Sequence, residues 1–313
     1  MPSLKSRLFI SMMRNRHLLK LRFSRETWDE NTSITDFRKQ CEDGAKLSGK
    51  LPDDINITKV NIPDLPEGLS AEWVRPKNAG ADDPVIFYTH GGGYVSGSCD
   101  DHRPFVAKIA HWSGLSVLQY EYRLAPEHPF PAAIEDTLTV YRWLLAQGFD
   151  PRRILIMGES AGGGLCLASM LAFRDNSLPL PAAGVSLSPW TDLTLSGESY
   201  QTKRYACLSP LDMAKVCCRH YAAGAERTNP WLSPLHGNLQ GLPPLLIMVG
   251  DDETLRDDST RFAEKAHQAG VDVTLRVAPG MVHCYPLMAP LFPEATAAMQ
   301  EICNFLKLHG YKN

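Results

Sequence analysis

A serine lies at the centre of a short glycine motif, Gly158-Glu159-Ser160-Ala161-Gly162. The motif directly follows the apolar run at residues 154–157 and precedes a second apolar segment, which predicts a sharp turn between a strand and a helix. Glycines two residues before and after Ser160 remove Cβ atoms that would clash in such a turn. The pattern favours Ser160 as the nucleophile of an acyl-transfer reaction. The alternative is a glycine-rich turn that only packs helix on strand.

A second glycine cluster, His90-Gly91-Gly92-Gly93, follows the apolar run at residues 84–89. Consecutive glycines leave backbone N–H groups open to whatever binds above the strand. The N–H groups of Gly92, Gly93 and Ala161 can converge on the oxyanion of a tetrahedral intermediate, where one donor typically contributes about 2.7–4 kcal/mol. A mobile loop and a phosphate-binding loop are the alternatives. A phosphate loop would continue with Lys-Ser or Lys-Thr, whereas Tyr94-Val95 follows here.

These motifs need a scaffold, and most of the chain alternates short apolar runs with longer segments of helical periodicity. The expected strands are residues 84–89, 115–122, 153–157, 184–188 and 245–249, and the expected helices are residues 103–112, 131–146, 161–174 and 259–269. A last strand at 271–277, a closing helix at 293–308 and an antiparallel pair at 55–60 and 69–75 complete the pattern. Buried strands with crossover helices predict an α/β fold, with a mostly parallel central sheet and helices on both faces.

Two regions depart from this alternation. Residues 1–52 mix cations with apolar residues at helical spacing, which predicts two or three amphipathic helices. Residues 193–241 contain many loop residues and one expected helix at 211–221. We expect residues 53–313 to form the catalytic domain. Residues 1–52, with a contribution from 193–241, are expected to cover the carboxyl edge of the sheet, where open α/β sheets bind ligands.

The composition of the 313-residue chain, 44% hydrophobic and 21% charged, is typical of a soluble globular protein. A formal net charge of -3 provides no global field for a polyanion, so nucleic acid is not an expected partner. Residues 1–25 are the exception, because they contain no acid and seven cations: Lys5, Arg7, Arg14, Arg16, Lys20, Arg22 and Arg25. We interpret these as the solvated face of the cap helices, with contact to a membrane surface as the alternative.

The expected location is the cytoplasm. No apolar run approaches the roughly 18–20 residues of a membrane span. No secretory signal is evident, because the apolar run at residues 8–13 is short and interrupted. None of the 8 cysteines has C-x-x-C spacing, so no metal site is expected and reduced thiols are the simpler interpretation.

With these motifs in this order, the chain resembles the hormone-sensitive lipase-like esterases, a branch of the α/β-hydrolases. Further similar stretches are EYRLAPEHPFPA at 121–132, SPWTDL at 188–193, GLPPL at 241–245 and GMVH at 280–283. The resemblance covers about residues 60–310 and implies an α/β-hydrolase fold with an N-terminal helical cap. It also implies a small-molecule ester as substrate and no cofactor. These esterases often dimerise through the last strands and helix, so a homodimer is a further expectation.

The same resemblance implies a catalytic triad in the chain order serine, acid, histidine. His283 has the required place, in a glycine-containing loop after the expected strand at 271–277. Laid without a gap on Leu255-Arg256-Asp257, the family's pattern puts Glu253 where relatives commonly have aspartate, and Asp252 is the alternative acid. Either carboxylate can orient the Nδ1–H of the histidine. Asp257 is interpreted as a carboxylate near a helix N-terminus.

Several other residues have weaker assignments. Trp190, in the stretch SPWTDL, and Tyr94, after the glycine cluster, are expected to contact the substrate, and a core position is the alternative for Trp190. Glu159 is assigned no chemistry. His90 is interpreted as a structural residue and His102 as a surface or packing residue.

The sequence therefore predicts a serine carboxylic ester hydrolase that acts through an acyl-enzyme on short to medium acyl esters. Hydrolysis of a lactone or an aryl amide at the same site is one alternative. A non-catalytic ligand-binding relative is another, and the presence of His283 argues against it.

Overall fold

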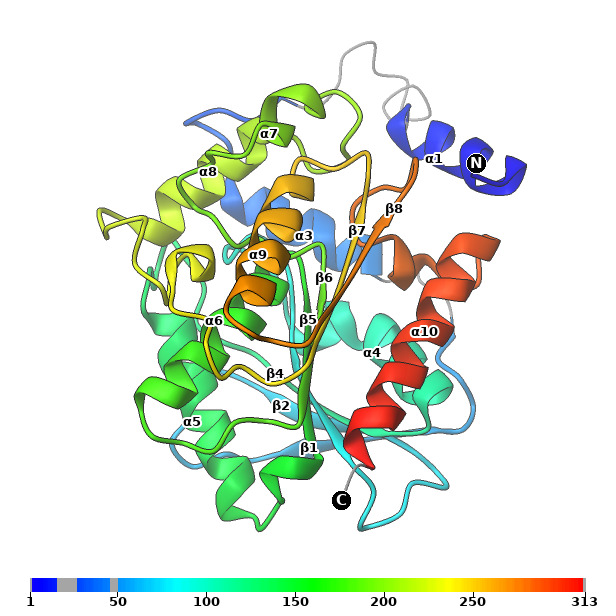
Figure 1. Cartoon of the computed structure of the whole chain (residues 1–313), viewed down its shortest axis with the longest axis vertical. Coiled ribbons are helices and arrows are strands. Elements are labelled where there is room, and N and C mark those ends of the chain that lie inside the picture. Colours follow the sequence, from blue (N-terminus) through cyan, green and yellow to red (C-terminus); the bar gives the residue numbers. More distant parts are fainter. Residues whose placement is uncertain (1, 16–26, 46–49, 312–313) are drawn as a thin grey trace.

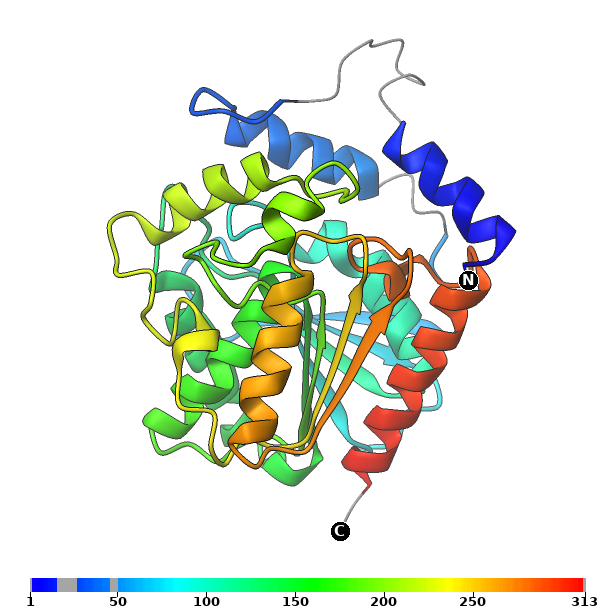
Figure 2. The ribbon, with the colours of Figure 1, turned by 45° about the horizontal axis from the view of Figure 1, so that its top comes forward.

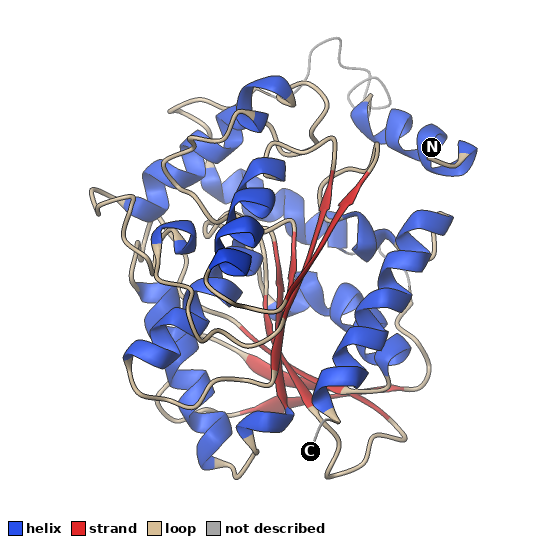
Figure 3. Cartoon of the chain, viewed as in Figure 1, coloured by secondary structure: helices blue, strands red, loops and turns tan. Residues whose placement is uncertain are grey.

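The computed structural model describes residues 2–15, 27–45 and 50–311. Within these residues, eight strands form one sheet in the order β1-β2-β4-β3-β5-β6-β7-β8, with helices on both faces (Figures 1 and 3). The strands are β1 (Ile55–Val60), β2 (Ala71–Pro76), β3 (Val85–Thr89), β4 (Ser116–Tyr120), β5 (Ile154–Glu159), β6 (Ala183–Leu187), β7 (Leu245–Gly250) and β8 (Val273–Ala278). β2 pairs antiparallel with β1 and β4, and the remaining pairs are parallel. The expected α/β fold and the antiparallel pair are confirmed.

The central strands are apolar runs because the sheet is covered on both sides. Every residue of β3 to β7 is buried. Successive side chains alternate between faces, so Phe87 packs in the cluster on one face while Ile86 and Tyr88 pack in the cluster on the other. Parallel strands with two covered faces read as continuous hydrophobic segments, which explains why their positions could be predicted closely.

The helices form two layers. α4 (Cys99–Ser113) and α10 (Pro293–Gly310) pack on one face, and α5 (Ala132–Ala146), α6 (Ala161–Asp175) and α9 (Arg256–Gln268) pack on the other (Figure 3). In the described ranges, the 3-10 turns η2 (Pro151–Arg153), η3 (Pro234–His236) and η4 (Tyr285–Met288) join elements. α4 begins four residues before the expected position, because Ser98 and Asp101 form a capping box at its N-terminus.

The start of α6 is pressed against the backbone of two neighbouring segments. A Cβ added to Gly162 would lie 2.2 Å from the carbonyl oxygen of Thr89, and one added to Gly164 would lie 2.1 Å from that of Trp190. No residue with a Cβ fits at either position without moving the main chain. The two glycines thereby fix the beginning of α6 relative to β3 and to the segment after β6.

The remaining helices lie at the end of the molecule where the parallel strands finish (Figure 2). They are α1 (Leu4–Arg14), α3 (Ile34–Ala45), the short α7 (Ser199–Thr202) and α8 (Leu211–Ala222). α8 confirms the helix expected at 211–221, whereas α7 was not expected. Arg16, Lys20, Arg22 and Arg25 lie outside the described residues. The division into a cap at 1–52 and a catalytic domain at 53–313 stays a prediction.

In the part of the chain that the structure describes, no helix is both long and apolar enough to cross a membrane. All eight cysteines are free thiols.

Candidate active site

Ser160 lies at the turn between β5 and α6. Its backbone has φ +55° and ψ -122°, a conformation that residues with a side chain rarely adopt and that typically costs about 1–3 kcal/mol. The Ser160 N–H donates to the carbonyl oxygen of Leu187 at 2.8 Å, which holds the turn against β6. A Cβ on Gly158 would lie 2.3 Å from Thr89 Oγ1, so the glycine spacing is a steric requirement. The turn leaves Ser160 partly exposed between buried neighbours.

The glycine cluster follows β3 and lines the same cavity as Ser160. Gly92 and Gly93 have φ +109° and +65°, which turns the chain back over the sheet edge. Among the described residues, no hydrogen bond uses the N–H of Gly92, Gly93 or Ala161. The three N–H groups predicted to bind an oxyanion are therefore not consumed by the fold.

His283 and Glu253 come from neighbouring loops, after β8 and β7 respectively. His283 Nδ1 lies 2.7 Å from Glu253 Oε2. The Glu253 side chain is completely buried, and its Oε1 accepts hydrogen bonds from the Gly250 N–H at 2.5 Å and the Ser188 hydroxyl at 2.8 Å. Three donors thus fix the position of one carboxylate, which in turn orients the imidazole.

The carboxylate also changes the acidity of the histidine. Burial lowers the pKa of His283, whereas Cys284 and Glu253 raise it. The resulting pKa lies well above the ordinary value for histidine. The neighbouring Cys284 side chain and the Glu253 carboxylate beside Nδ1 both favour the imidazolium form, and together they outweigh the effect of burial.

Asp252, the alternative acid, does not contact His283 in this arrangement. Its carboxylate pairs with Arg14 of α1 at 2.7 Å and with Lys203 at 3.4 Å. Asp257 lies in the first turn of α9, as expected, and accepts the Ser199 N–H at 2.8 Å. Of the two candidates for the triad acid, the structure brings Glu253 to the histidine.

A cavity of about 330 Å³ opens above Ser160 and His283. Its walls are mainly apolar, and they come from α4, from the segment between β6 and β7, from the residue before α9 and from η4. The apolar wall residues are Phe105, Trp190, Pro210, Met213, Ala214, Leu255, Leu287 and Met288. The shape and chemistry suit a small, neutral, largely hydrophobic ligand.

The two residues predicted to contact the substrate differ. Trp190 lines the cavity and is also 3% exposed, so it is a wall residue and a core residue at once. Tyr94 is not on the cavity wall. Its ring is buried and stacks on Tyr221 of α8 at a centroid distance of 3.8 Å. The backbone of Tyr94 is left-handed (φ +61°), and the ring packs in the core. Contact between Tyr94 and the substrate stays a prediction, which this position does not favour.

Sequence reasoning missed a buried network beneath the glycine cluster. Glu159 Oε1 accepts the Gly91 N–H at 2.6 Å and lies 3.1 Å from His102 Nε2, while Oε2 accepts the Tyr88 hydroxyl. His102 Nδ1 lies 2.6 Å from Asp101. Burial lowers the pKa of His102, but the two carboxylates outweigh this effect and raise the pKa to about 10. His102 is thus a partly buried cation whose Nε2 holds the Glu159 carboxylate in place.

Little in the sequence marks this network. His102 lies far from Glu159 along the chain, and the two meet only because α4 packs over β2 and β4, on the sheet face where its apolar residues share a core cluster with those of β3 and β5. A usable signal was the acid next to the nucleophile, since a buried carboxylate at that position requires a partner. Among the described residues, no group of three or more His, Cys, Asp or Glu could hold a metal ion.

A family model for the alpha/beta hydrolase fold matches residues 86–287. Among curated relatives, an acetyl-hydrolase of Streptomyces hygroscopicus is 43% identical over 240 residues, which cover 76% of this chain and 79% of the relative. An ethyl acetate hydrolase of Pseudomonas putida is 33% identical over 291 residues, 87% of this chain and 89% of the relative.

Solved structures resemble the whole chain. The esterase EstE5, soaked with p-nitrophenyl butyrate, has a TM-score of 0.89 and 38% identity and covers 99% of this chain and 100% of its own. An esterase of the bacterial hormone-sensitive lipase family has a TM-score of 0.88 and 40% identity, with 99% of each chain covered.

Proposed function

Because this chain belongs to the α/β-hydrolase family, in the hormone-sensitive lipase-like branch, and is a carboxylesterase like its relatives, we propose that it cleaves esters through a covalent acyl-enzyme formed on Ser160. The single observation that carries this proposal is the contact of 2.7 Å between His283 and Glu253 on the wall of the cavity that also holds Ser160. Such a contact fixes the tautomer of a general base beside a nucleophile.

Acylation begins when His283 takes the Ser160 proton at Nε2, because Nδ1 is engaged by Glu253. The serine oxygen attacks the ester carbonyl, and the tetrahedral intermediate collapses as His283 returns the proton to the leaving alcohol. Water then enters, and its oxygen attacks the acyl carbonyl as His283 accepts its proton. The bond between the acyl carbon and the Ser160 oxygen breaks, His283 returns the proton to that oxygen, and the carboxylic acid leaves. Glu253 holds Nδ1 of His283 and stabilises the imidazolium.

The negative charge that develops on the carbonyl oxygen is stabilised by the N–H groups of Gly92, Gly93 and Ala161. Their freedom from other hydrogen bonds among the described residues supports this role. Preorganised donors need no rearrangement at the moment of reaction, and each typically contributes about 2.7–4 kcal/mol.

The substrate is an uncharged ester with a short to medium acyl chain. The cavity of about 330 Å³ and its apolar walls support this choice. No Lys or Arg side chain lines it in the described part of the chain, so a substrate carboxylate or phosphate would be desolvated without a cationic partner. The names of two relatives, an acetyl-hydrolase and an ethyl acetate hydrolase, agree with small acyl groups.

The test compares the wild type with Ser160→Ala on p-nitrophenyl acetate, butyrate and octanoate, together with labelling by a fluorophosphonate probe. We expect the variant to lose turnover and labelling on every ester. A transient acyl-enzyme on Ser160, trapped by rapid quenching and located by peptide mass spectrometry, would directly support the mechanism. Equal turnover in both proteins would contradict it, and so would labelling at another residue.

A further inference from the structure

Helix α1 is fixed to the rest of the protein at both of its ends. At its start, the Ser3 hydroxyl donates to Glu294 of α10 at 3.0 Å. At its end, Arg14 donates to the carbonyl oxygen of Ala206 at 2.8 Å and to Asp252 at 2.7 Å. Between these anchors Ile10 is 3% exposed. The side of α1 that carries Ile10 therefore packs against the protein. The opposite side faces solvent.

That opposite side presents an apolar stripe to solvent. Leu4, Leu8 and Met12 are 70%, 64% and 48% exposed. At spacings of four residues, each lies about 40° further around the helix, so the three form one stripe over two turns. The other large apolar side chains that are exposed among the described residues are spread over β1, β8, α10 and loops: Ile57, Tyr205, Val277, Leu291, Leu308 and Tyr311. Exposed apolar residues that occur singly need no explanation, whereas a stripe on one helix face does.

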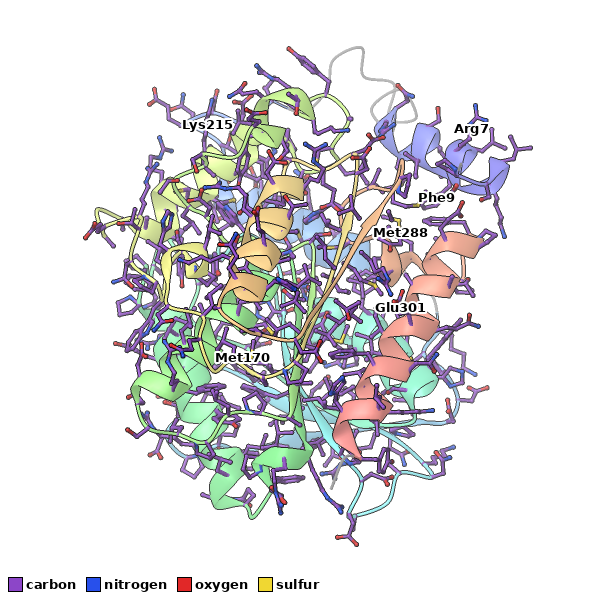
Figure 4. All side chains as sticks on the ribbon, in the orientation of Figure 1. Arg7, Phe9, Met170, Lys215, Met288 and Glu301 are labelled. Atoms are coloured by element: carbon purple, nitrogen blue, oxygen red, sulfur yellow. The ribbon has the colours of Figure 1, made fainter. Side chains whose placement is uncertain are left out.

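Two exposed cations flank the stripe. At about 100° per residue, Lys5 lies just beyond Met12 on one side of the stripe and Arg7 lies beyond Leu4 on the other. Figure 4 shows Arg7 on the side of α1 that faces away from the body, and Phe9 on the side toward Met288. Residues 1–25 contain no acid, although the chain as a whole is -3. The face thus combines an apolar stripe with cations on both margins, and no acidic side chain of the described residues forms an ion pair with Lys5 or Arg7.

An apolar stripe flanked by cations indicates what kind of surface α1 binds. Leucine and methionine side chains gain from entering an apolar layer, while flanking lysine and arginine keep their charges at an anionic surface. A second copy of the chain fits poorly, because a two-fold contact through α1 would bring Lys5 and Arg7 close to the same residues of the other copy. We propose that α1 is an interfacial helix that binds the surface of anionic lipid bilayers.

The position of α1 gives this contact a consequence for the cavity. Phe9 packs on Phe292 with ring centroids 5.8 Å apart. Phe292 follows η4, whose Leu287 and Met288 line the cavity above Ser160. A bilayer bound to the stripe would lie on the outer side of α1, and the inner side of the same helix contacts the segment next to this cavity wall. The lipid contact itself does not depend on the proposed ester hydrolysis.

The test is cosedimentation of the full chain with vesicles of phosphatidylcholine alone or with added phosphatidylglycerol. We expect binding only to the anionic vesicles, because the cations provide roughly 1 kcal/mol each at such a surface, and we expect it to weaken in 1 M NaCl. Two variants remove one component each. Leu4→Gln/Leu8→Gln/Met12→Gln removes the stripe with a residue of good helix propensity, and Lys5→Glu/Arg7→Glu reverses the flanking charges. Both should bind at least tenfold less.

Leu308→Gln is the matched control, because Leu308 is 59% exposed on α10 and belongs to no stripe. It should bind like the wild type. Hydrolysis of water-soluble p-nitrophenyl acetate should be the same in all four proteins, which shows that the variants are folded. The proposal would be overturned if the stripe variant and the charge-reversal variant both bound anionic vesicles as strongly as the wild type does. Equal binding to neutral vesicles would also overturn it, and so would a wild-type dimer that the stripe variant dissociates while no vesicle binding is seen.

Discussion

Two histidines, His283 and His102, each contact a buried carboxylate, and they are held differently. His283 has a carboxylate at one ring nitrogen only, Glu253 at 2.7 Å from Nδ1. His102 has one at each, with Asp101 at 2.6 Å from Nδ1 and Glu159 at 3.1 Å from Nε2. His283 lines the cavity, whereas His102 does not.

The difference separates a group built to exchange a proton from a group built to keep one. A histidine with one nitrogen toward a substrate cavity can accept and return a proton in each catalytic cycle. A histidine between two carboxylates stays charged, with its pKa raised to about 10, and serves as a fixed positive link. We therefore expect His283 to act in the chemistry and His102 to act only through the position of Glu159 and Gly91.

The largest expected effect is that of removing the proton-exchanging histidine. His283→Gln should lower kcat/KM by roughly 100,000-fold, since loss of the general base disables the nucleophile. His102→Gln should cost no more than about 100-fold, because no reacting proton passes through it. Steady-state rates on p-nitrophenyl butyrate would measure both, and comparable losses would erase the distinction between the two histidines.

The next effect concerns the acid that holds His283. Glu253→Gln should lower kcat by roughly 10,000-fold, because an amide can hold the ring in the wrong tautomer and cannot stabilise the imidazolium. Asp252→Asn is a matched control one residue away, with its carboxylate paired to Arg14 and Lys203 instead. It should stay within about threefold of the wild type. A larger loss in Asp252→Asn than in Glu253→Gln would reverse the assignment of the acid.

A smaller effect should follow from loosening the glycine cluster. Glu159→Gln replaces an oxygen that accepts the Gly91 N–H with a group that can present an N–H2 there, and the kcat should fall about 10- to 100-fold. A positioning role predicts that affinity for a boronate, which mimics the tetrahedral intermediate, falls in parallel with kcat/KM while KM changes little. If boronate affinity is unaffected while kcat falls, Glu159 does not act through the oxyanion donors.

The smallest effect is a shift in pH dependence. His283 must be neutral to accept the serine proton, so kcat/KM should rise with pH through the pKa of His283, which lies above its ordinary value. Removing the charge in Glu253→Gln should move this limb to lower pH, since the imidazolium is no longer stabilised. His102→Gln should leave the limb in place. If the limb shifted in His102→Gln and not in Glu253→Gln, the titrating group would be His102 and not His283.

The sequence predicted those parts of the molecule whose structure depends on residues close together in the chain. Buried parallel strands are apolar runs, so the strand expected at 245–249 is observed at Leu245–Gly250. The turn that presents Ser160 needs glycines at fixed offsets, and these are readable from a single chain. The placement of Glu253 rather than Asp252 beside His283 came from alignment with a family pattern, because spacing alone does not decide between adjacent carboxylates.

The parts that could not be predicted depend on packing between distant segments. His102 meets Glu159 only after α4 and β5 are placed by the core, and no pattern in either segment names the other. Tyr94 follows the glycine cluster directly, yet its ring stacks on Tyr221 of α8, far along the chain. In both cases the tertiary neighbour decides the role of the side chain.

The glycines at the start of α6 have a genetic consequence. Any single-base change in a glycine codon that alters the amino acid introduces a side chain with a Cβ. At Gly162 and Gly164 that atom would fall within 2.2 Å and 2.1 Å of main-chain oxygens, so every such missense allele must displace a strand or a loop. The heritable vulnerability of this esterase therefore extends to two codons whose residues never meet the substrate.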